Sequence, residues 1–359
     1  MKIAIDCRMI NSSGVGIYLQ GVLPYLLKSH NDFLLLGNTS DLQLFKSYTN
    51  VNILQCNIKP FSIKDLFYFP PSLLKHINSC SLFFSPFFNI PASIFKHISI
   101  PVYTCIHDLA FHDIPGLTSV IGLALRKLLY RRSYQKSKKI FTVSNFSKSR
   151  IEYHFGTSKP VVVTYSALQP FIISYIEQKQ KPQKTKTIVF VGNIKKHKGL
   201  GILCDAFIKA KNNGLQYKLI IIGEKKNFRS SDNSIMEKIN NIKNEDIYFT
   251  GNVSNATLLH YLSQAALLVQ PSLYEGFGLP PLEAMALGTC VLVSDIPVFR
   301  EIYDGFPLHY FKSQDTNDLA NKLMELLFEK TPPSPLLSKE LLSQYTFKKT
   351  SSIILQELM

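Results

Sequence analysis

Short runs of apolar residues recur along the whole chain, and stretches with a helical pattern separate several of them. These runs have the length of buried strands. In the first half they predict strands at residues 2–7, 33–36, 51–54, 82–84, 102–106, 140–143 and 161–164. In the second half they predict strands at residues 187–191, 217–222, 247–250, 267–270 and 290–294. Because strands that alternate with helices form parallel sheets, the predicted fold class is α/β.

The strand–helix pattern starts twice, which indicates two domains. The first series begins with a strand, a loop that contains Gly14 and Gly16, and a helix from Ile17 to Leu27. This order is typical of nucleotide-binding α/β units. A polar, Lys-rich stretch at residues 176–187 precedes the second start, and we interpret it as an interdomain linker or a surface loop.

The chain of 359 residues is long enough for two such domains. We therefore expect two Rossmann-like, doubly wound domains at residues 1–175 and 176–345. Ligands of such sheets bind beyond the carboxyl ends of the strands, so a central cleft that the two domains face is the expected active site.

Composition indicates a soluble protein, since 46% of the residues are hydrophobic and 18% are charged. We expect no transmembrane helix, because no run of about 18 apolar residues occurs. Asp6 and Arg8 interrupt the first apolar run, so a secretion signal is not expected either. The six cysteines are scattered without metal-ligand spacing, and we expect reduced, mostly buried thiols in a cytoplasmic protein.

The net charge of +15 is unevenly distributed. Residues 1–175 hold 18 Lys/Arg against 7 Asp/Glu, a net +11, and the rest of the chain holds 22 against 18, a net +4. Such a field favours an anionic partner. No nucleic-acid-binding motif accompanies the charge, so we expect no nucleic-acid partner and consider an anionic membrane leaflet instead.

Nine Lys/Arg and no Asp/Glu lie between Arg126 and Arg150, with leucines among them. The pattern predicts a basic amphipathic helix. One interpretation is peripheral docking on the inner face of the cytoplasmic membrane. The other is a solvated helix face whose apolar side packs on the sheet.

The segment YEGFGLPPLEAMALG, residues 274–288, carries the most specific chemistry. Gly276 and Gly278 permit a tight loop that a ligand can approach closely, and the two prolines that follow suit the first turn of a helix at about residues 280–287. The free N–H groups of a helix start bind anions such as phosphates. Glu283, expected in the first turn, can accept hydrogen bonds from a ribose, while Glu275 lies on the loop before it.

This segment resembles the glutamate–seven–glutamate motif of glycosyltransferase family four, which has the GT-B fold and retains anomeric configuration. Further likenesses are DCRMINSSGVGIY (6–18), HDLAF (107–111), TVSNFSKS (142–149), FVGNIKKHKGL (190–200), FTGNVSNATL (249–258) and YTFKK (345–349). The resemblance implies an acceptor-side first domain, a donor-binding second domain, and a C-terminal helix at residues 346–359 that returns towards the first domain.

The resemblance also implies the site residues. The catalytic ones would be Glu275, His107 and Lys198. Those that bind the donor would be Gly14, Gly16, Asn193, Lys198, Phe277, Gly278, Leu279 and Glu283. Lys198 matches the family's phosphate lysine, whereas Asn193 stands where an arginine is common, and Arg300 is one candidate to compensate.

The implied reaction is transfer of a hexose, of mannose type or another, from a nucleotide diphosphate sugar to a glycan or lipid-linked acceptor in surface polysaccharide or lipopolysaccharide assembly. Neither a metal nor another cofactor is expected. Two other enzyme classes remain. A nucleotide-sugar epimerase of the same fold would act without an acceptor, and a dinucleotide-dependent dehydrogenase would need a GxGxxG fingerprint that SSGVGIY does not match. A nucleic-acid-binding protein has only the charge in its favour.

Overall fold

The computed structural model describes residues 1–178, 182–223, 246–328 and 337–359. The chain divides into two compact units. Unit 1 contains Met1–Leu109, Val120–Ala167 and Tyr345–Met359, and unit 2 contains Ala110–Ser119 and Leu168–Gln344. The chain therefore passes between the units four times.

Unit 1 is built on a parallel sheet of seven strands in the order β3-β2-β1-β4-β5-β6-β7. Every strand predicted for the first half of the chain is present. Their bounds are β1 (Lys2–Asp6), β2 (Asp32–Gly37), β3 (Val51–Gln55), β4 (Leu82–Ser85), β5 (Val102–Cys105), β6 (Ser137–Thr142) and β7 (Val161–Val163). The order reverses between β1 and β4, so this sheet is doubly wound.

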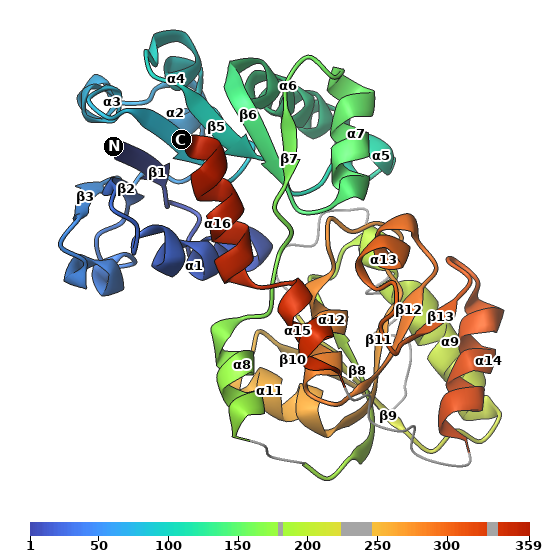
Figure 1. Ribbon diagram of the computed structural model, residues 1–359. Coiled ribbons are helices and arrows are strands. Elements are labelled where there is room, and N and C mark those ends of the chain that lie inside the picture. Colours follow the sequence, from blue (N-terminus) through green and yellow to red (C-terminus); the bar gives the residue numbers. More distant parts are fainter. Residues whose placement is uncertain (179–181, 224–245, 329–336) are drawn as a thin grey trace. The chain divides into compact units, whose positions relative to one another are not determined.

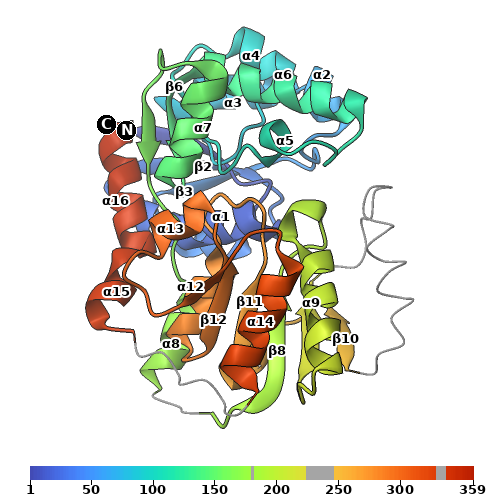
Figure 2. The ribbon, with the colours of Figure 1, turned by 90° about the vertical axis from the view of Figure 1, so that its right-hand side faces the viewer.

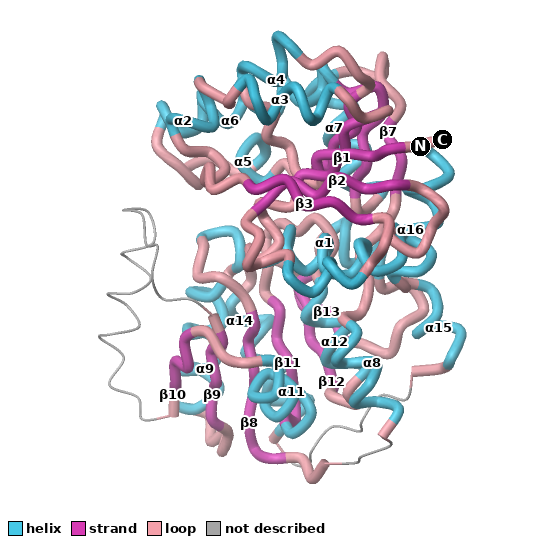
Figure 3. The backbone as a smooth tube through the Cα atoms, turned by 90° about the vertical axis from the view of Figure 1, so that its left-hand side faces the viewer, coloured by secondary structure: helices cyan, strands magenta, loops and turns pink. Residues whose placement is uncertain are grey.

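Helices cover both faces of the first sheet (Figure 3). One face carries α2 (Ile63–Phe67), α3 (Pro71–Asn78), α4 (Ala92–His97) and α6 (Val120–Lys136), and α7 (Asn145–Phe155) packs on β6 and β7. The other face carries α1 (Ser13–Leu26) and α16 (Phe347–Leu358), and the 3-10 turn η1 (Gln43–Ser47) contacts β3.

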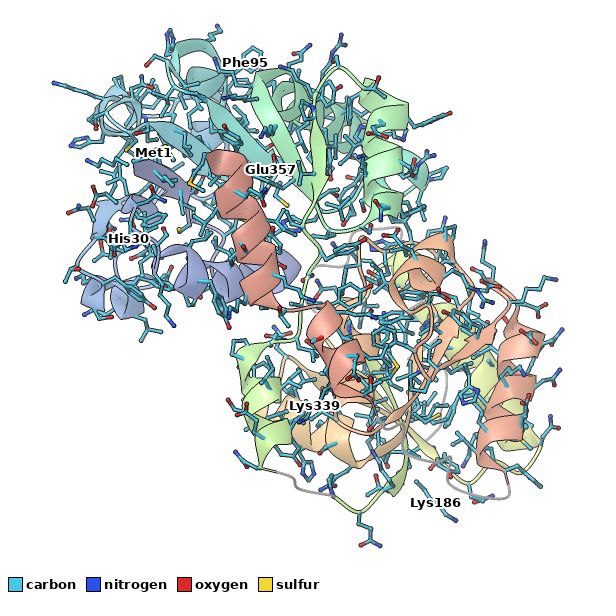
Figure 4. All side chains as sticks on the ribbon, in the orientation of Figure 1. Met1, His30, Phe95, Lys186, Lys339 and Glu357 are labelled. Atoms are coloured by element: carbon cyan, nitrogen blue, oxygen red, sulfur yellow. The ribbon has the colours of Figure 1, made fainter. Side chains whose placement is uncertain are left out.

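The C-terminal helix α16 belongs to unit 1, as expected for a helix that returns to the first domain. It packs along α1 so closely that a Cβ on Gly21 would overlap the ring of Phe347. Near the other end of α16, Lys139 of β6 donates to a Glu357 carboxylate oxygen at 2.6 Å (Figure 4).

Unit 2 is built on a parallel sheet of six strands in the order β10-β9-β8-β11-β12-β13. The strands are β8 (Thr185–Val191), β9 (Lys218–Ile222), β10 (Ile247–Gly251), β11 (Ala265–Gln270), β12 (Cys290–Ser294) and β13 (His309–Phe311). The first five were predicted. The three-residue edge strand β13 was missed because its apolar run is too short to stand out.

The helical segments assigned to unit 2 are α5 (Ala110–Asp113), α8 (Pro170–Glu177), η2 (Lys196–Lys198), α9 (Leu200–Asn212), α11 (Asn255–Gln264), α12 (Leu279–Ala286), α13 (Pro297–Ile302), α14 (Thr316–Leu327) and α15 (Lys339–Gln344). Helices α9 and α14 lie on one face of this sheet, and α8, α11 and α12 lie on the other (Figures 1 and 2). The main core lies between the sheet and the helices α9 and α14, where Phe207 and Leu323 are fully buried.

The boundary between the units differs from the expected one at residues 175 and 176. It lies between Ala167 and Leu168, so α8 already belongs to unit 2. Tyr175 of α8 donates to the Ser263 hydroxyl at 3.4 Å, and α8 contacts α12. The polar stretch 176–187 therefore begins in the last turn of α8 and ends in β8, while residues 179–181 lie outside the described ranges.

The basic stretch between Arg126 and Arg150 is not one helix. It is divided among α6, β6 and α7, because Ile140 and Phe141 are fully buried in a strand that pairs with both β5 and β7. The prediction of a single basic amphipathic helix was wrong. Within the described ranges, no helix is long and apolar enough to cross a bilayer. All six cysteines are buried, as expected.

Candidate active site at the switch point of unit 2

Two loops of unit 2 leave the carboxyl ends of neighbouring strands. One follows β8 and contains Asn193 and Lys198, and the other follows β11 and contains Glu275 and Gly278. The strand order reverses between β8 and β11, since the chain runs outward from β8 to β10 on one side and from β11 to β13 on the other. Ligands of doubly wound sheets bind at such a reversal.

Lys198 and Glu275 meet at this point. The Lys198 Nζ donates to both carboxylate oxygens of Glu275 at 2.7 Å. The Glu275 side chain is 8% exposed and that of Lys198 is 20% exposed. The sequence placed both residues near the donor, and the structure brings them together as a direct ion pair.

Polar groups of β11 and its loop hold the Glu275 carboxylate in place. The Ser272 hydroxyl donates to Glu275 Oε1 at 2.7 Å, and the Gln270 amide donates to the same oxygen at 3.4 Å. The Ser294 hydroxyl at the end of β12 donates to the Ser272 carbonyl. Ser272, Gln270 and Ser294 are buried, so they fix one orientation of the carboxylate.

The loop that carries Lys198 packs tightly on the loop that carries Glu275. Gly199 has a left-handed backbone with φ of +68°, and a Cβ there would overlap the Pro271 carbonyl. The Leu273 N–H donates to the His197 carbonyl at 2.7 Å. Burial, together with the charges of Lys198 and Lys195, lowers the pKa of His197 to about 2, so this imidazole is neutral.

The glycine loop turns into helix α12 at Gly278. Gly278 has φ of +88°, a Cβ on it would overlap the ring of Phe299, and its carbonyl accepts from the Tyr303 hydroxyl. The helix starts at Leu279, with its prolines at the start as predicted. Phe277 is 4% exposed, so its side chain is buried and only its backbone could contact a ligand.

Glu283 lies in the second turn of α12, not in the first as expected, because the helix begins one residue earlier than predicted. Its carboxylate is 3% exposed and accepts from the Gln169 amide at 2.8 Å. Burial raises the pKa of Glu283 to about 6, and the hydrogen bond from Gln169 opposes that shift. A buried carboxylate with so few donors can accept further hydrogen bonds from a ligand.

Among the residues that the structure describes, neither Asn193 nor Arg300 offers the expected phosphate-binding arginine. Asn193 follows Gly192 at the end of β8 and is half-buried. Arg300, the candidate to compensate, donates to both oxygens of Asp295 at 2.7 and 3.0 Å, and its guanidinium lies 3.6 Å from the centre of the Tyr310 ring. Arg300 is thus engaged elsewhere on unit 2.

The remaining predicted residues belong to unit 1. His107 follows β5, and its Nε2 lies 2.8 Å from the Pro86 carbonyl, so Nε2 carries the proton and donates. Burial lowers the pKa of His107, although the Pro86 carbonyl and Asp108 oppose the shift. In the neutral ring Nδ1 is therefore a hydrogen-bond acceptor.

Gly14 and Gly16 lie in the first turn of α1 rather than in the loop before it. A Cβ on Gly16 would lie 2.5 Å from the Ile10 carbonyl oxygen, so Gly16 is needed for packing. A Cβ on Gly14 would meet no atom within 4 Å. Gly14 is the one of the two where a ligand can approach the backbone.

Sequence reasoning missed the residues that support the two glutamates. Ser272 precedes Glu275 by three residues, a spacing that favours a local hydrogen bond and was a readable signal. Gln169 is far from Glu283 in sequence, and no pattern indicated it.

Tyr274 connects the segment Ala110–Ser119 to the loop that carries Glu275, since its hydroxyl donates to Asp113 at 2.9 Å.

Comparison with solved structures shows the fold. The chain matches the Anabaena protein Alr3699/HepE in complex with UDP and glucose with a TM-score of 0.71, at 16% identity, over 100% of this chain and 99% of that one. It matches sucrose-phosphate synthase from Thermosynechococcus elongatus with a TM-score of 0.73, at 15% identity, over 100% and 98%. The fold is that of the GT-B glycosyltransferases.

Curated relatives match in sequence over about half of their length. The O-antigen chain mannosyltransferase RfbU of Salmonella typhimurium is 32% identical over 202 residues, which cover 55% of this chain and 53% of RfbU. The O-antigen chain mannosyltransferase B of Escherichia coli is 25% identical over 210 residues, 55% of this chain and 54% of that protein. Residues 172–336 match the family model described as glycosyl transferases group 1. This segment holds Lys198, Glu275 and Glu283, so these three residues of the candidate site lie in the part of the chain that is similar to the glycosyl transferases group 1 family.

Proposed function

We propose that this protein is a retaining hexosyltransferase that moves a sugar from a nucleoside diphosphate sugar to a glycan or lipid-linked acceptor in the assembly of a surface polysaccharide or lipopolysaccharide. The observation that carries the proposal is the Lys198–Glu275 ion pair at the switch point of unit 2, beside the start of α12. The mannosyltransferase relatives support a donor that carries mannose. The UDP-glucose complex of Alr3699/HepE supports a UDP-sugar as the second candidate donor.

The diphosphate would lie between Lys198 and the first N–H groups of α12. An ammonium has three N–H donors, and the two oxygens of Glu275 take two of them. The third donor can bind a phosphate oxygen without loss of the ion pair. The N–H groups near Gly278 and Leu279 add an anion-binding helix start.

The nucleoside end would lie at Glu283. Its carboxylate is buried and has the Gln169 amide as a donor, so a ribose diol can supply the further hydrogen bonds that a buried charge requires. The sugar end would lie at Glu275, whose carboxylate binds sugar hydroxyls and stabilises positive charge that develops on the anomeric carbon. His107, with Nδ1 as an acceptor, would receive a hydroxyl of the donor sugar.

Departure of the nucleoside diphosphate leaves negative charge on the β-phosphate. Lys198 and the helix start would stabilise this charge more in the transition state than in the ground state, which accelerates the reaction. We propose that no metal is needed, because these groups supply the positive charge. The leaving phosphate can take the acceptor proton on the same face of the sugar, which retains the configuration.

The test is a panel of nucleotide sugars that includes GDP-mannose and UDP-glucose, scored by thermal shift and by slow donor hydrolysis in the presence of EDTA. We expect one donor to stabilise the protein and to be hydrolysed, with release of the α-anomer from an α-linked donor. If no nucleotide sugar stabilised the protein or was turned over, the proposal would be overturned. Full loss of hydrolysis in EDTA, restored by added Mg²⁺, would contradict the metal-free reaction.

A further inference from the structure

Helix α2 of unit 1 exposes large apolar side chains to solvent. Ile63 is 79% exposed, Phe67 is 68% exposed and Tyr68, which follows the helix, is 63% exposed. Ile63 and Phe67 are four residues apart and therefore lie on one side of the helix. Exposed apolar clusters on a soluble fold are usually interaction sites.

The surface around α2 is basic. From residue 56 to residue 101 the charged side chains that are exposed are all lysines: Lys59, Lys64, Lys75 and Lys96. The single carboxylate of this stretch, Asp65, is fully buried. It accepts from Arg8 at 2.6 Å and from the Phe61 N–H at 2.8 Å, so the fold removes the one negative charge from this surface.

A groove of about 780 Å³ opens beside α2, between α3 and α4. Tyr68, Phe69 and Leu74 give it an apolar lining, and Lys75, Asn78 and His97 add polar and basic groups. The half-buried Phe95 of α4, labelled in Figure 4, packs against the hydrophobic core of this face. The helices α2, α3 and α4 lie together on one face of the sheet (Figure 3). We call residues 56–101 of this face the α2–α4 surface.

Aromatic and aliphatic side chains that are surrounded by lysines fit the interface of an anionic bilayer. The apolar groups enter the headgroup region while the lysines attract the negative leaflet. A nucleic acid would use the charge but would not need Ile63 and Phe67 in solvent. We propose that the α2–α4 surface docks unit 1 on an anionic phospholipid bilayer, with Ile63, Phe67 and Tyr68 inserted and with a lipid phosphate near Lys75 and His97 in the groove.

This surface differs from the stretch between Arg126 and Arg150. There the basic side chains are divided among three elements, and Lys139 is paired with Glu357. Helix α6 also exposes apolar residues, Val120 at 85% and Ile121 at 83%, but, unlike Ile63, they have no exposed aromatic side chain beside them on the helix. Aromatic side chains are the ones that favour the headgroup level. Helix α6 therefore provides a matched control for the α2–α4 surface.

The inference deepens the proposed function, because a bilayer would present a lipid-linked acceptor to unit 1. It can be tested without that function. The full chain is sedimented with vesicles of phosphatidylglycerol and phosphatidylethanolamine, and with vesicles of phosphatidylcholine. We expect the protein to bind the anionic vesicles at least tenfold more strongly, and added salt to weaken the binding.

The variant Ile63→Ser/Phe67→Ser should lose at least tenfold in binding to anionic vesicles, and Lys64→Glu/Lys75→Glu should lose a similar amount. The control Val120→Ser/Ile121→Ser should lose less than threefold. All of these side chains are exposed, so each variant should unfold at the wild-type temperature and hydrolyse the donor at the wild-type rate. Wild-type binding by both α2–α4 variants, a larger loss in the control, equal binding to neutral vesicles or no binding to any vesicle would overturn the inference. Donor hydrolysis, which tests the proposed function, does not depend on vesicle binding. The two proposals can therefore fail separately.

Discussion

Lys198 and Glu275 are 77 residues apart in sequence, yet the Lys198 ammonium donates to both oxygens of the Glu275 carboxylate at 2.7 Å. They meet because β8 and β11 are neighbours in the sheet and both loops leave the same edge. The pair joins the group proposed to stabilise the leaving phosphate to the group proposed to bind the sugar. Substitution of either residue should therefore affect both ends of the reaction.

Lys198→Met should lower donor turnover by about 100-fold or more, because the charge that develops on the β-phosphate loses its cation. The matched control is Lys196→Met, since Lys196 is an exposed lysine of the same 3-10 turn. The measurement is donor hydrolysis under saturating donor, with circular dichroism to check folding. Equal rates in the two variants would remove Lys198 from the mechanism.

Ser272→Ala should lower turnover by about tenfold, because a hydrogen bond to a buried charged group is lost and the Glu275 carboxylate is less firmly oriented. The effect should fall on kcat, with KM for the donor little changed, because Ser272 contacts Glu275 rather than the substrate. Ser272→Thr keeps the hydroxyl and should restore part of the rate. A Ser272→Ala enzyme with unchanged kcat would show that Lys198 alone suffices to hold the carboxylate.

Gly199→Ala should destabilise unit 2 more than Gly251→Ala does. Both glycines have a left-handed backbone, with φ of +68° and +71°. The strain of that backbone costs an alanine about 1 kcal/mol at either position. At Gly199 the Cβ also overlaps the Pro271 carbonyl, whereas at Gly251 it meets no atom within 4 Å. The check is thermal unfolding, and equal melting temperatures would mean that the two loops are not packed as described.

Glu283→Gln should stabilise the protein at pH 7.5 by about 2 kcal/mol while it weakens donor binding. Burial raises the pKa of Glu283 from 4.5 to about 6, and one pKa unit corresponds to about 1.4 kcal/mol. A raised carboxyl pKa favours folding at low pH, and this contribution is lost as the pH rises through about 6. The stability difference between variant and wild type should therefore vanish below pH 4.5.

Thermal unfolding of both proteins from pH 4 to pH 8 measures this difference. A stability difference between variant and wild type that stayed constant from pH 4 to pH 8 would contradict the titration of Glu283. Donor affinity, measured by thermal shift at pH 7.5, provides the second readout. Retention of wild-type affinity in Glu283→Gln would show that the nucleoside lies elsewhere.

The sequence predicts the parts of this structure that depend on local pattern. Each predicted strand overlaps an observed one, with ends that differ by at most three residues, and the loop–helix turn at Gly278 followed from its glycines and prolines. Contacts between distant segments could not be read in this way. The support of Glu283 by Gln169 depends on how α8 packs near α12, which no single-sequence pattern reports.

Contacts between distant segments also explain the two incorrect predictions, the domain boundary and the basic helix. The polar stretch 176–187 has the composition of a linker, but the packing of α8 decides that the units divide earlier, at Ala167. The positive charges between Arg126 and Arg150 suggested one helix, whereas burial of Ile140 and Phe141 breaks the stretch into three elements. In both cases tertiary burial outweighed local composition.

The position of α16 at the end of this sequence also affects the order in which the two units can fold during synthesis. Helix α16 completes unit 1, and its Phe347 ring fills the space that Gly21 leaves on α1. The ribosome makes α16 after all of unit 2. Until then unit 1 is incomplete and the apolar side of α1 is uncovered, whereas unit 2 can already fold. Unit 2, although it follows in sequence, should therefore be the first to become native, and the nascent first half should depend on chaperones until residue 358 has emerged.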